Sequence, residues 1–422
     1  MVTMDSNIKV TLNWENKDKN LLYFDENETP IWGDLNSISN RKMIEQYYYQ
    51  DQTDLSNSSN MLIKGDNLLA LLKLKDTFKN KIKCVYIDPP FNTGKTFNHY
   101  SDGLERPLWL SMMKIRLEVL KELLTDDGAI FVHIDDDEMP YLKVLMDEIF
   151  NDNTNSITGD SDNHVATIVW QKKASPQNDA KFFSDTHDFI LVYAKDKSKL
   201  KLNGMSRTNI QNSRYTNRDN DVRGPWTSSD LTVRTPNPDY LYGITLPSGR
   251  IVHPSPSRSW GIPEGTFKNL VKDNRIWFGD SGDSMPRRKR FLSEVKQDVT
   301  PKTIWLRDEV GDNSEGKKEV KKFTEIADDI FTTPKPERLL KRILEIATDE
   351  NDWVLDAFLG SGTTCAVAHK MNRQWIGLEN GEQIDTICVP RLKAVIDGID
   401  KGGITKSSNW EKGGGFKYYK IM

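Results

Sequence analysis

Short apolar runs and helical spacings alternate along the first part of the chain, and this alternation predicts an α/β fold. Residues 61–65, 81–88 and 129–134 are apolar and rich in β-branched side chains, which is typical of buried strands. Segments with helical spacing follow them, at residues 68–75, 108–124 and 141–150. Strands and helices in this order form a parallel sheet that helices cover on both faces.

The pattern continues with two more strands and then breaks. Residues 165–173 and 188–196 predict strands, whereas residues 198–322 are dominated by Asn, Arg, Pro and Gly and predict an irregular insertion without a long helix. Order returns with a helix that begins at Pro336, strands at residues 353–358 and 374–379, and a last helix through Arg391.

These changes of pattern predict four segments. Residues 1–60 are polar and acidic and predict an N-terminal arm or short helices. Residues 61–197 and 323–422 predict the two parts of one α/β domain, and residues 198–322 predict a domain inserted between them.

The most informative strand end is the sequence YIDPPF. Pro89 and Pro90 have no N–H to donate, so the strand is expected to end at Asp88. The carboxylate of Asp88 and the ring of Phe91 are therefore expected to project from the carboxyl edge of the sheet, which is where open α/β sheets bind ligands.

A second strand-to-helix turn carries the sequence DAFLGSGTT, with Asp356, Phe358, Gly360 and Gly362. Glycines let the backbone approach a ligand closely, and Glu379, at the end of the next strand, can accept hydrogen bonds from both hydroxyls of a ribose. This pattern predicts a nucleoside site. Cys365 stands where an NAD fingerprint has its third glycine, and no lysine follows as in a phosphate-binding loop.

Charge is spread unevenly over the 422 residues, whose net charge is −4. Residues 165–305 contain 23 Lys and Arg against 14 Asp and Glu, a balance of +9. A basic middle between acidic ends predicts a local site for a polyanion, and a solvated surface is the alternative.

The cysteines and the apolar runs bear on the compartment. Cys84, Cys365 and Cys388 are far apart in the sequence and have no CxxC spacing, which fits a reducing cytoplasm. The apolar runs are too short to span a membrane, and the N-terminus lacks the features of a signal peptide, so we expect a cytoplasmic protein.

The two motifs together resemble those of the DNA amino-methyltransferases that use S-adenosylmethionine. DPPF resembles their target-base motif and FLGSG their cofactor motif, and DPPF comes first, as in the β group of the family. Further segments, among them GAIFVHIDDDE, TPKPERLL and GGGFKYY, resemble the modification (Mod) subunits of type III restriction–modification systems.

This resemblance implies a permuted Rossmann-like sheet, an inserted target-recognition domain at residues 198–322, and methyl transfer from S-adenosylmethionine to N6 of a flipped-out adenine. The implied catalytic residues are Asp88, Pro89, Pro90 and Phe91. The implied cofactor-binding residues are Asp66, Lys335, Pro336, Asp356, Phe358, Gly360, Gly362, Thr363 and Glu379, of which Thr363 could equally cap a helix.

Double-stranded DNA is the implied partner. Trp170 is expected to cover the second face of the base, with a core position as the equal alternative. In the insertion, Arg and Asn can read base edges and clustered cations can neutralise phosphates. The candidates are Arg207, Arg214, Arg218 and Arg223 for bases or the flipped strand, and Arg287, Arg288, Lys289 and Arg290 for phosphates.

Several alternatives stay open at this point. The sequence HIDDDE, residues 133–138, contains five potential metal ligands, but consecutive residues point in different directions, and we expect a strand-end loop with no metal. The insertion is short for a type III Mod subunit, which leaves open a stand-alone or phage-borne enzyme. The partners that stay open are a second copy of the chain, in a homodimer, and a restriction (Res) helicase-nuclease subunit. A cytosine-N4 methyltransferase and a non-catalytic DNA-recognition subunit are the other readings.

Overall fold

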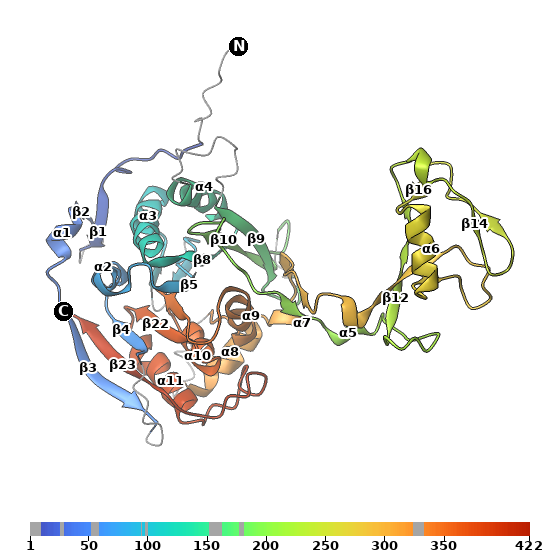
Figure 1. The fold of residues 1–422 in the computed structure, drawn as a ribbon. Helices are drawn as coiled ribbons and strands as arrows, with labels where there is room; N and C mark the ends of the chain where they lie inside the picture. Colours follow the sequence, from blue (N-terminus) through green and yellow to red (C-terminus); the bar gives the residue numbers. More distant parts are fainter. Residues whose placement is uncertain are drawn as a thin grey trace, which may run out of the picture. The chain divides into compact units, whose positions relative to one another are not determined.

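The computed structural model describes residues 10–25, 29–51, 59–93, 95–97, 100–151, 163–176, 181–323 and 333–422. The chain forms two compact units (Figure 1). The first comprises residues 1–203 and 301–422, and the second comprises residues 204–300. None of the helices in the described part of the chain combines the length and the apolar character that a bilayer crossing requires.

A mixed sheet lies at the centre of the first unit. In the described residues its strands follow the order β20 (Ile304–Trp305), β9 (His164–Gln171), β10 (His187–Ala194), β8 (Leu124–Ile134), β5 (Ile82–Ile87), β21 (Trp353–Asp356), β22 (Gln374–Glu379), β4 (Met61–Lys64), β23 (Gly415–Ile421) and β3 (Met43–Gln50). The strands from β8 to β23 in this order all pair in parallel. Their carboxyl ends therefore meet at one edge of the sheet.

Two groups of helices cover the two faces of this sheet (Figure 1). One group contains α2 (Asn67–Phe78), α3 (Arg106–Leu123) and α4 (Met139–Phe150), and the other contains α9 (Glu337–Ala347), α10 (Thr363–Lys370) and α11 (Val389–Ile396). Strand β22 shows how the faces divide: Ile376 and Leu378 enter the core beside α2 and α3. Gly377 points the other way, where a Cβ would lie 2.6 Å from Cys365 Sγ of α10.

The predicted strands and helices of both parts of the α/β domain are confirmed, but the prediction for residues 1–60 is wrong. Residues 43–50 form β3, an edge strand of the central sheet that pairs with β23. Two further strands of this segment, β1 (Asn20–Phe24) and β2 (Pro30–Gly33), pair with each other, and α1 (Leu35–Ile38) follows them. Strand β23 was also not predicted, because its sequence GFKYYKI follows a glycine-rich, polar stretch.

The second unit is smaller than the predicted insertion and more regular. Residues 301–322 belong to the first unit, where β20 pairs with β9 and α7 (Arg307–Val310) and α8 (Asn313–Val320) follow. Inside the second unit, β12 (Trp226–Asp230), β18 (Arg287–Phe291) and β17 (Ile276–Trp277) form an antiparallel sheet. Apolar side chains around Trp260 and Phe267 of α6 (Glu264–Lys272) give this unit a core of its own.

Short strand pairs complete the fold. They are β6 (Lys95–Phe97) with β7 (Tyr100–Asp102), β11 (Met205–Ser206) with β19 (Asp298–Val299), β13 (Thr232–Val233) with β16 (Ser259–Trp260), and β14 (Ile244–Thr245) with β15 (Ile251–Val252). The pair β11 and β19 joins the first and the last strand of the second unit.

A buried ionic network ties α9, α10 and α11 together behind the sheet. Glu337 accepts hydrogen bonds from Lys370 Nζ at 2.8 Å and from Arg391 Nη2 at 2.9 Å. Asp400 accepts a second bond from Lys370 Nζ at 2.6 Å. The side chains of Lys370 and Arg391 are fully buried, so their charges depend on these carboxylates.

Replacing Lys370 with Met should therefore lower the free energy of unfolding by about 3–5 kcal/mol, because Glu337 and Asp400 would lose a buried counter-ion. Urea unfolding measures the change. The exposed Lys406 offers a matched control, and Lys406→Met should change the free energy of unfolding by about 0.5 kcal/mol or less. Equal effects of the two substitutions would contradict a stabilising role of the network.

Candidate active site

Asp88 lies directly after β5, at the carboxyl edge of the sheet. Its Oδ2 atom accepts a hydrogen bond from Lys335 Nζ at 2.5 Å. Its Oδ1 atom is buried, and among the described residues it has no hydrogen-bond partner. A buried carboxylate oxygen without a donor is costly, which indicates that a ligand supplies the missing hydrogen bond.

The ring of Phe91 lies near a cation and an imidazole. Lys335 Nζ lies 5.3 Å from the centre of the Phe91 ring. On the same ring, His133 stacks with a centroid distance of 5.8 Å and an angle of 14° between the planes. The carbonyl of Pro90 accepts a hydrogen bond of 2.8 Å from the indole N–H of the buried Trp109. This bond attaches the DPPF segment to α3.

His133 belongs to a buried polar chain that engages both of its ring nitrogens. Its ring nitrogens lie 3.1 Å from the hydroxyl of Tyr86 and 3.2 Å from Oδ2 of Asp188. Asp188 also accepts a bond of 2.7 Å from Lys172. Burial, together with the charge of Lys335, lowers the pKa of His133, so the ring is neutral at pH 7. His133 therefore supports Phe91 as a neutral, hydrogen-bonded ring.

The turn after β21 is the second half of the site. Gly360 and Gly362 have positive φ angles of 56° and 81°, which side chains with a Cβ rarely adopt. The carboxylate of Glu379, at the end of β22, accepts hydrogen bonds from the backbone N–H of Gly360 at 2.7 Å and of Asn380 and Gly381 at 2.9 Å. Glu379 therefore fixes the shape of this turn.

Asp356 lies buried beneath the same turn. Its carboxylate accepts hydrogen bonds from the backbone N–H of Phe358 at 2.9 Å and from the hydroxyl of Thr364 at 2.5 Å. Burial raises the pKa of Asp356 to about 7, and the nearby charges of Asp88 and Glu379 act in the same direction. At neutral pH this carboxyl group is therefore close to half protonated.

One pocket of about 870 Å³ joins the two halves. Its lining includes Asp88, Phe91, Lys335, Phe358, Gly360 and Glu379. This volume is within the range of about 300–1,000 Å³ that is typical of small-molecule sites. Two segments that lie 270 positions apart in the sequence therefore form one cavity.

Asp66 lines this pocket and is the N-cap of α2. It accepts a hydrogen bond from the backbone N–H of Leu69 at 3.1 Å, and Arg116 Nη2 approaches its other oxygen at 3.4 Å. The buried Arg116 also donates to Asn67 Oδ1 at 2.6 Å, and Asn67 in turn donates to the carbonyl of Ala357. This arrangement connects the beginning of α2 to the glycine turn.

Two of the residues predicted to bind a cofactor lie outside the pocket lining, and the hydroxyl of a third is engaged by another side chain. Gly362 and Pro336 do not line the pocket, because Gly362 faces Cys388, the N-cap of α11, and the buried Pro336 faces Gly311. Thr363 lines the pocket, but its hydroxyl accepts a hydrogen bond of 2.8 Å from the buried Arg391. The contacts of these three residues stabilise the conformation around the turn and do not offer groups to a ligand in the pocket.

Arg116 and Asn313 are two of the pocket residues that were not predicted from the sequence. Arg116 lies in a helix whose apolar spacing gave no signal for a buried cation. Asn313, at the start of α8, lines the pocket, and its Oδ1 atom is buried and without a hydrogen-bond partner in the described part of the chain. Its backbone N–H donates to the carbonyl of Lys172, which brings α8 to the end of β9.

The structure contradicts the prediction that Trp170 covers a base. The indole of Trp170 is fully buried, and its N–H donates to the carbonyl of Gly311 at 3.0 Å. The ring meets the edge of His133 and leaves no face open to a ligand. The alternative, a core position, is confirmed.

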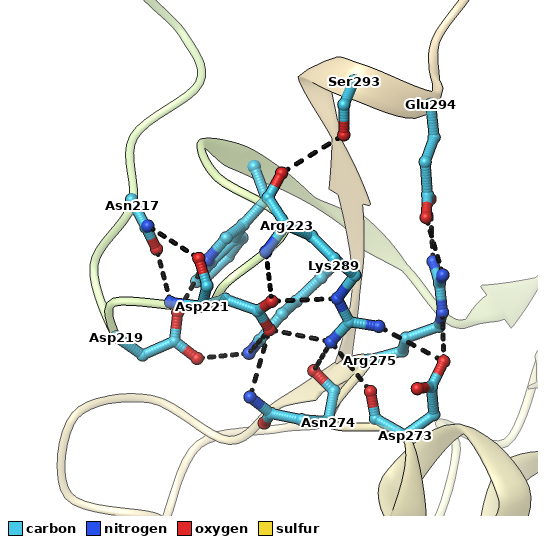
Figure 2. A network of polar contacts seen from close by, with 11 residues as sticks. Asn217, Asp219, Asp221, Arg223, Asp273, Asn274, Arg275, Lys289, Ser293 and Glu294 are labelled. Atoms are coloured by element: carbon cyan, nitrogen blue, oxygen red, sulfur yellow. Dashed lines mark hydrogen bonds and ion pairs between the residues drawn. The ribbon is translucent and has the colours of Figure 1, made fainter.

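Two of the predicted DNA contacts in the second unit are also wrong, because these side chains are bound within the unit (Figure 2). Lys289 is fully buried and lies against Asp219 and Asp221. Arg223 forms hydrogen bonds of 2.8 Å to Asp221 and stacks over Phe291. The bonds from Arg223 hold the pKa of Asp221 well below its usual range, which shows how strongly the network favours the charged forms.

The remaining predicted DNA contacts are accessible to different degrees. Arg288 and Arg290 are exposed on the face of β18 opposite to the buried Lys289 and Phe291, since alternate residues of a strand point to opposite faces. Arg287, the first residue of the strand, is exposed as well. Arg214 and Arg218 are exposed, whereas Arg207 is half-buried and donates to Asn212. The run RRKR is therefore a strand with three exposed cations, and not a continuous charged loop.

An exposed group near the pocket meets the distance requirement for a metal site. Asp136, Asp185 and His187 place ligand atoms within 4.8 Å of one another. Exposed acidic groups of this kind are common without an ion, so the arrangement by itself assigns no metal.

Comparison with known proteins identifies relatives of the chain. The family model for DNA methylases matches residues 82–389. The HindVI Mod subunit of Haemophilus influenzae, a probable type III restriction-modification enzyme, is 33% identical over 87% of this chain and 55% of its own length. The type III StyLTI Mod subunit of Salmonella typhimurium is 33% identical over 79% of this chain and 52% of its own length. The chain therefore spans about half the length of these relatives.

A solved structure, the M1.HpyAVI–SAM complex, is 14% identical to the chain. The match has a TM-score of 0.41 and covers 79% of this chain and 98% of that chain.

The raised pKa of Asp356 predicts a pH dependence of stability. The folded state holds the proton up to about pH 7, whereas the unfolded state releases it near pH 3.8, so this contribution to stability is lost as the pH rises between these values. Between pH 5 and pH 7 the wild type should lose about 2 kcal/mol more stability than Asp356→Asn, because one pKa unit corresponds to about 1.4 kcal/mol.

Urea unfolding of the two proteins at pH 5, 6 and 7 measures this difference. Asn resembles the protonated acid, since its Oδ1 can accept from Phe358 and its Nδ2 can donate to Thr364. A constant offset between the two proteins at all three values would contradict a raised pKa.

Proposed function

The chain belongs to the DNA methylase family, and from this premise we propose that it transfers a methyl group from S-adenosylmethionine to N6 of an adenine flipped out of double-stranded DNA. The observation that carries the proposal is Asp88 Oδ1, a buried acceptor without a partner among the described residues. It opens into the same pocket as the glycine turn and Glu379. One cavity thus offers a place for a nucleoside-bearing cofactor beside an acceptor for an amino group.

The residues of the pocket fit S-adenosylmethionine. The left-handed Gly360 exposes backbone to the pocket, and Phe358 adds an apolar wall. Glu379, which accepts hydrogen bonds from three backbone N–H groups at the end of β22, lies where ribose hydroxyls would bind. Asp66 would meet the adenosine end, since it lines the same cavity at the start of α2. When bound, the cofactor supplies a methyl group on a positively charged sulfur.

Positioning is the main task of the protein groups in this reaction. The lone pair of an adenine N6 is delocalised into the ring, which makes the nitrogen a poor nucleophile. Asp88 Oδ1 and the carbonyl of Pro89 would accept the two N–H groups of N6 and favour a tetrahedral nitrogen. With the cofactor bound, a bond would form between N6 and the methyl carbon that it supplies, the sulfur would keep the electron pair of the broken carbon–sulfur bond, and N6 would release a proton to solvent.

Lys335 and Phe91 would complete this arrangement. Lys335 holds the other oxygen of Asp88 and so fixes the direction of Oδ1. Phe91, supported by the neutral ring of His133, offers an aromatic face on which the flipped base can stack. In this proposal Lys335 acts on the catalytic carboxylate, whereas the resemblance implied that it binds the cofactor.

The second unit is proposed as the target-recognition domain. It carries the exposed arginines of β18 together with Arg214 and Arg218, which suits contact with phosphates and base edges. The names of the relatives favour a role as the modification component of a restriction–modification system, with a restriction subunit as partner and a homodimer as a possible assembly. A stand-alone or phage-borne enzyme is the alternative.

The nature of the product decides between the main alternatives. Plasmid DNA is incubated with the protein and with S-adenosylmethionine labelled in its methyl group, digested to nucleosides and analysed by mass spectrometry. Labelled N6-methyladenine supports the proposal, whereas N4-methylcytosine would replace it with the cytosine alternative. DNA that is bound but carries no label would favour a non-catalytic recognition subunit. Sequencing of the methylated DNA then gives the recognition site.

Replacing Asp88 with Ala should lower the rate of methylation by at least about 10²-fold, because the acceptor that localises the lone pair of N6 is lost. The affinity for S-adenosylmethionine, measured by calorimetry, should stay close to that of the wild type, since Asp88 lies at the base end of the pocket in this proposal. The exposed Asp137 provides the control, and Asp137→Ala should keep the full rate. Full activity of Asp88→Ala would contradict the catalytic assignment.

Replacing both Arg287 and Arg288 with Gln should weaken binding to all DNA sequences, because each arginine is expected to neutralise a phosphate. The slope of log affinity against log salt should flatten by about 0.9 for each lost contact. Lys268→Gln, on the exposed face of α6 in the same unit, should leave the slope unchanged. An unchanged slope in the double variant would show that β18 does not meet the DNA backbone.

A further inference from the structure

Two adjacent phenylalanines lie exposed on the loop between β9 and β10. The exposed fraction of Phe182 is 83% and that of Phe183 is 95%. Two large apolar side chains side by side in water are unusual on a soluble domain and mark a surface that meets another molecule. Neither ring belongs to the core or contributes to the pocket described above.

This loop begins and ends at the catalytic pocket. Lys172 and Lys173, just after β9, line the pocket, and so does Asp185, just before β10. Only one residue separates Phe183 from Asp185, so their Cα atoms lie at most about 7 Å apart. The two rings are therefore presented beside the opening that leads to Asp88.

The base of the loop is fixed. The backbone N–H of Lys172 donates to the carbonyl of Thr186 at 3.0 Å. The Lys172 ammonium bridges the two ends of the loop, with bonds of 2.5 Å to Asp185 and 2.7 Å to Asp188. Because Asp188 also holds His133, the loop is anchored to the same buried chain that supports Phe91.

The charges around the two rings favour DNA as the molecule that covers them. Lys181 Nζ lies 5.2 Å from the centre of the Phe182 ring. Within the described residues, neither Lys181 nor Lys173 forms an ion pair, so one cation over a Phe182 face and a second in the pocket lining are available to phosphates. A protein partner that covered an apolar patch of this size would not require an unpaired cation over the ring.

We propose that Phe182 and Phe183 form a wedge that enters the duplex at the target site and fills the space vacated by the flipped adenine. This inference rests on the proposed function, because only an enzyme that extrudes a base needs such a wedge. Extrusion leaves the neighbouring bases unstacked. Apolar side chains inserted between base steps restore part of the lost contact, and aromatic rings stack on any base without regard to sequence.

The test compares two synthetic duplexes that carry the recognition site obtained from sequencing. In one, the target adenine is paired with thymine; in the other, it faces an abasic site and needs little energy to leave the helix. For Phe182→Ala/Phe183→Ala we expect kcat/KM on the paired duplex to fall by at least about tenfold. On the abasic duplex it should stay within about twofold of the wild type, because the wedge is no longer needed there.

Two further variants separate a wedge from a general effect. Phe182→Leu/Phe183→Leu keeps two bulky apolar side chains and should recover most of the rate on the paired duplex. Ile399→Ala removes an apolar side chain that is 70% exposed and does not line the pocket, and it should behave as the wild type on both duplexes. Calorimetry with S-adenosylmethionine should give one affinity for all variants.

Three outcomes would overturn the inference. An equal loss on both duplexes would indicate a role in binding or folding, and an unchanged rate on the paired duplex would show that the rings do not act on DNA. A lower oligomeric mass of the alanine variant without a difference between the duplexes would make the surface an interface between copies of the chain. Wild-type protein that methylates neither duplex would refute the proposed function itself, and the inference with it.

Discussion

The parallel pairing of β5 with β21 is the contact on which the pocket depends. Leu355 lies opposite Val85 and Val354 opposite Cys84, although 270 residues separate the two strands. Since both strands run in the same direction, both end at one edge of the sheet, and the DPPF segment lies beside the glycine turn. The pairing of β21 with β22 then places Glu379 next to that turn. A slip of this pairing would separate the two halves of the cavity even if each kept its own conformation.

Several carboxyl groups lie at this edge of the sheet, and their mutual repulsion is reduced in a different way for each. Asp88 is held by an ammonium group, Glu379 is surrounded by backbone N–H groups, and Asp356 takes up a proton more readily because it is buried. The three environments differ in whether a carboxylate oxygen can still accept a hydrogen bond from a ligand. Among the described residues, Oδ1 of Asp88 has no hydrogen-bond partner, whereas the carboxylate of Asp356 is committed to the turn. A pocket rich in acids also suits a cofactor with a positive charge.

The sequence predicts those parts of the site that local chemistry determines. The strand end at Asp88 follows from two prolines without N–H groups, and the glycine turn follows from residues that tolerate positive φ angles. Contacts across the fold could not be predicted in this way. Arg116 looks like any cation on an amphipathic helix until Asp66 and Asn67 are placed beside it. Trp170 can be buried because its indole N–H donates to the carbonyl of Gly311, which is 141 residues away in the sequence.

The run RRKR shows a related limit, since its net charge is evident from the sequence but its direction is not, and a strand turns Lys289 inward against Asp219. The unit that contains this strand begins and ends on one ribbon, because β11 and β19 pair with each other. A segment attached by a single ribbon can be exchanged for another without disturbing the order of the central sheet. Such a connection allows the second unit to diverge in evolution as a cassette, while the sheet edge and its pocket are inherited unchanged.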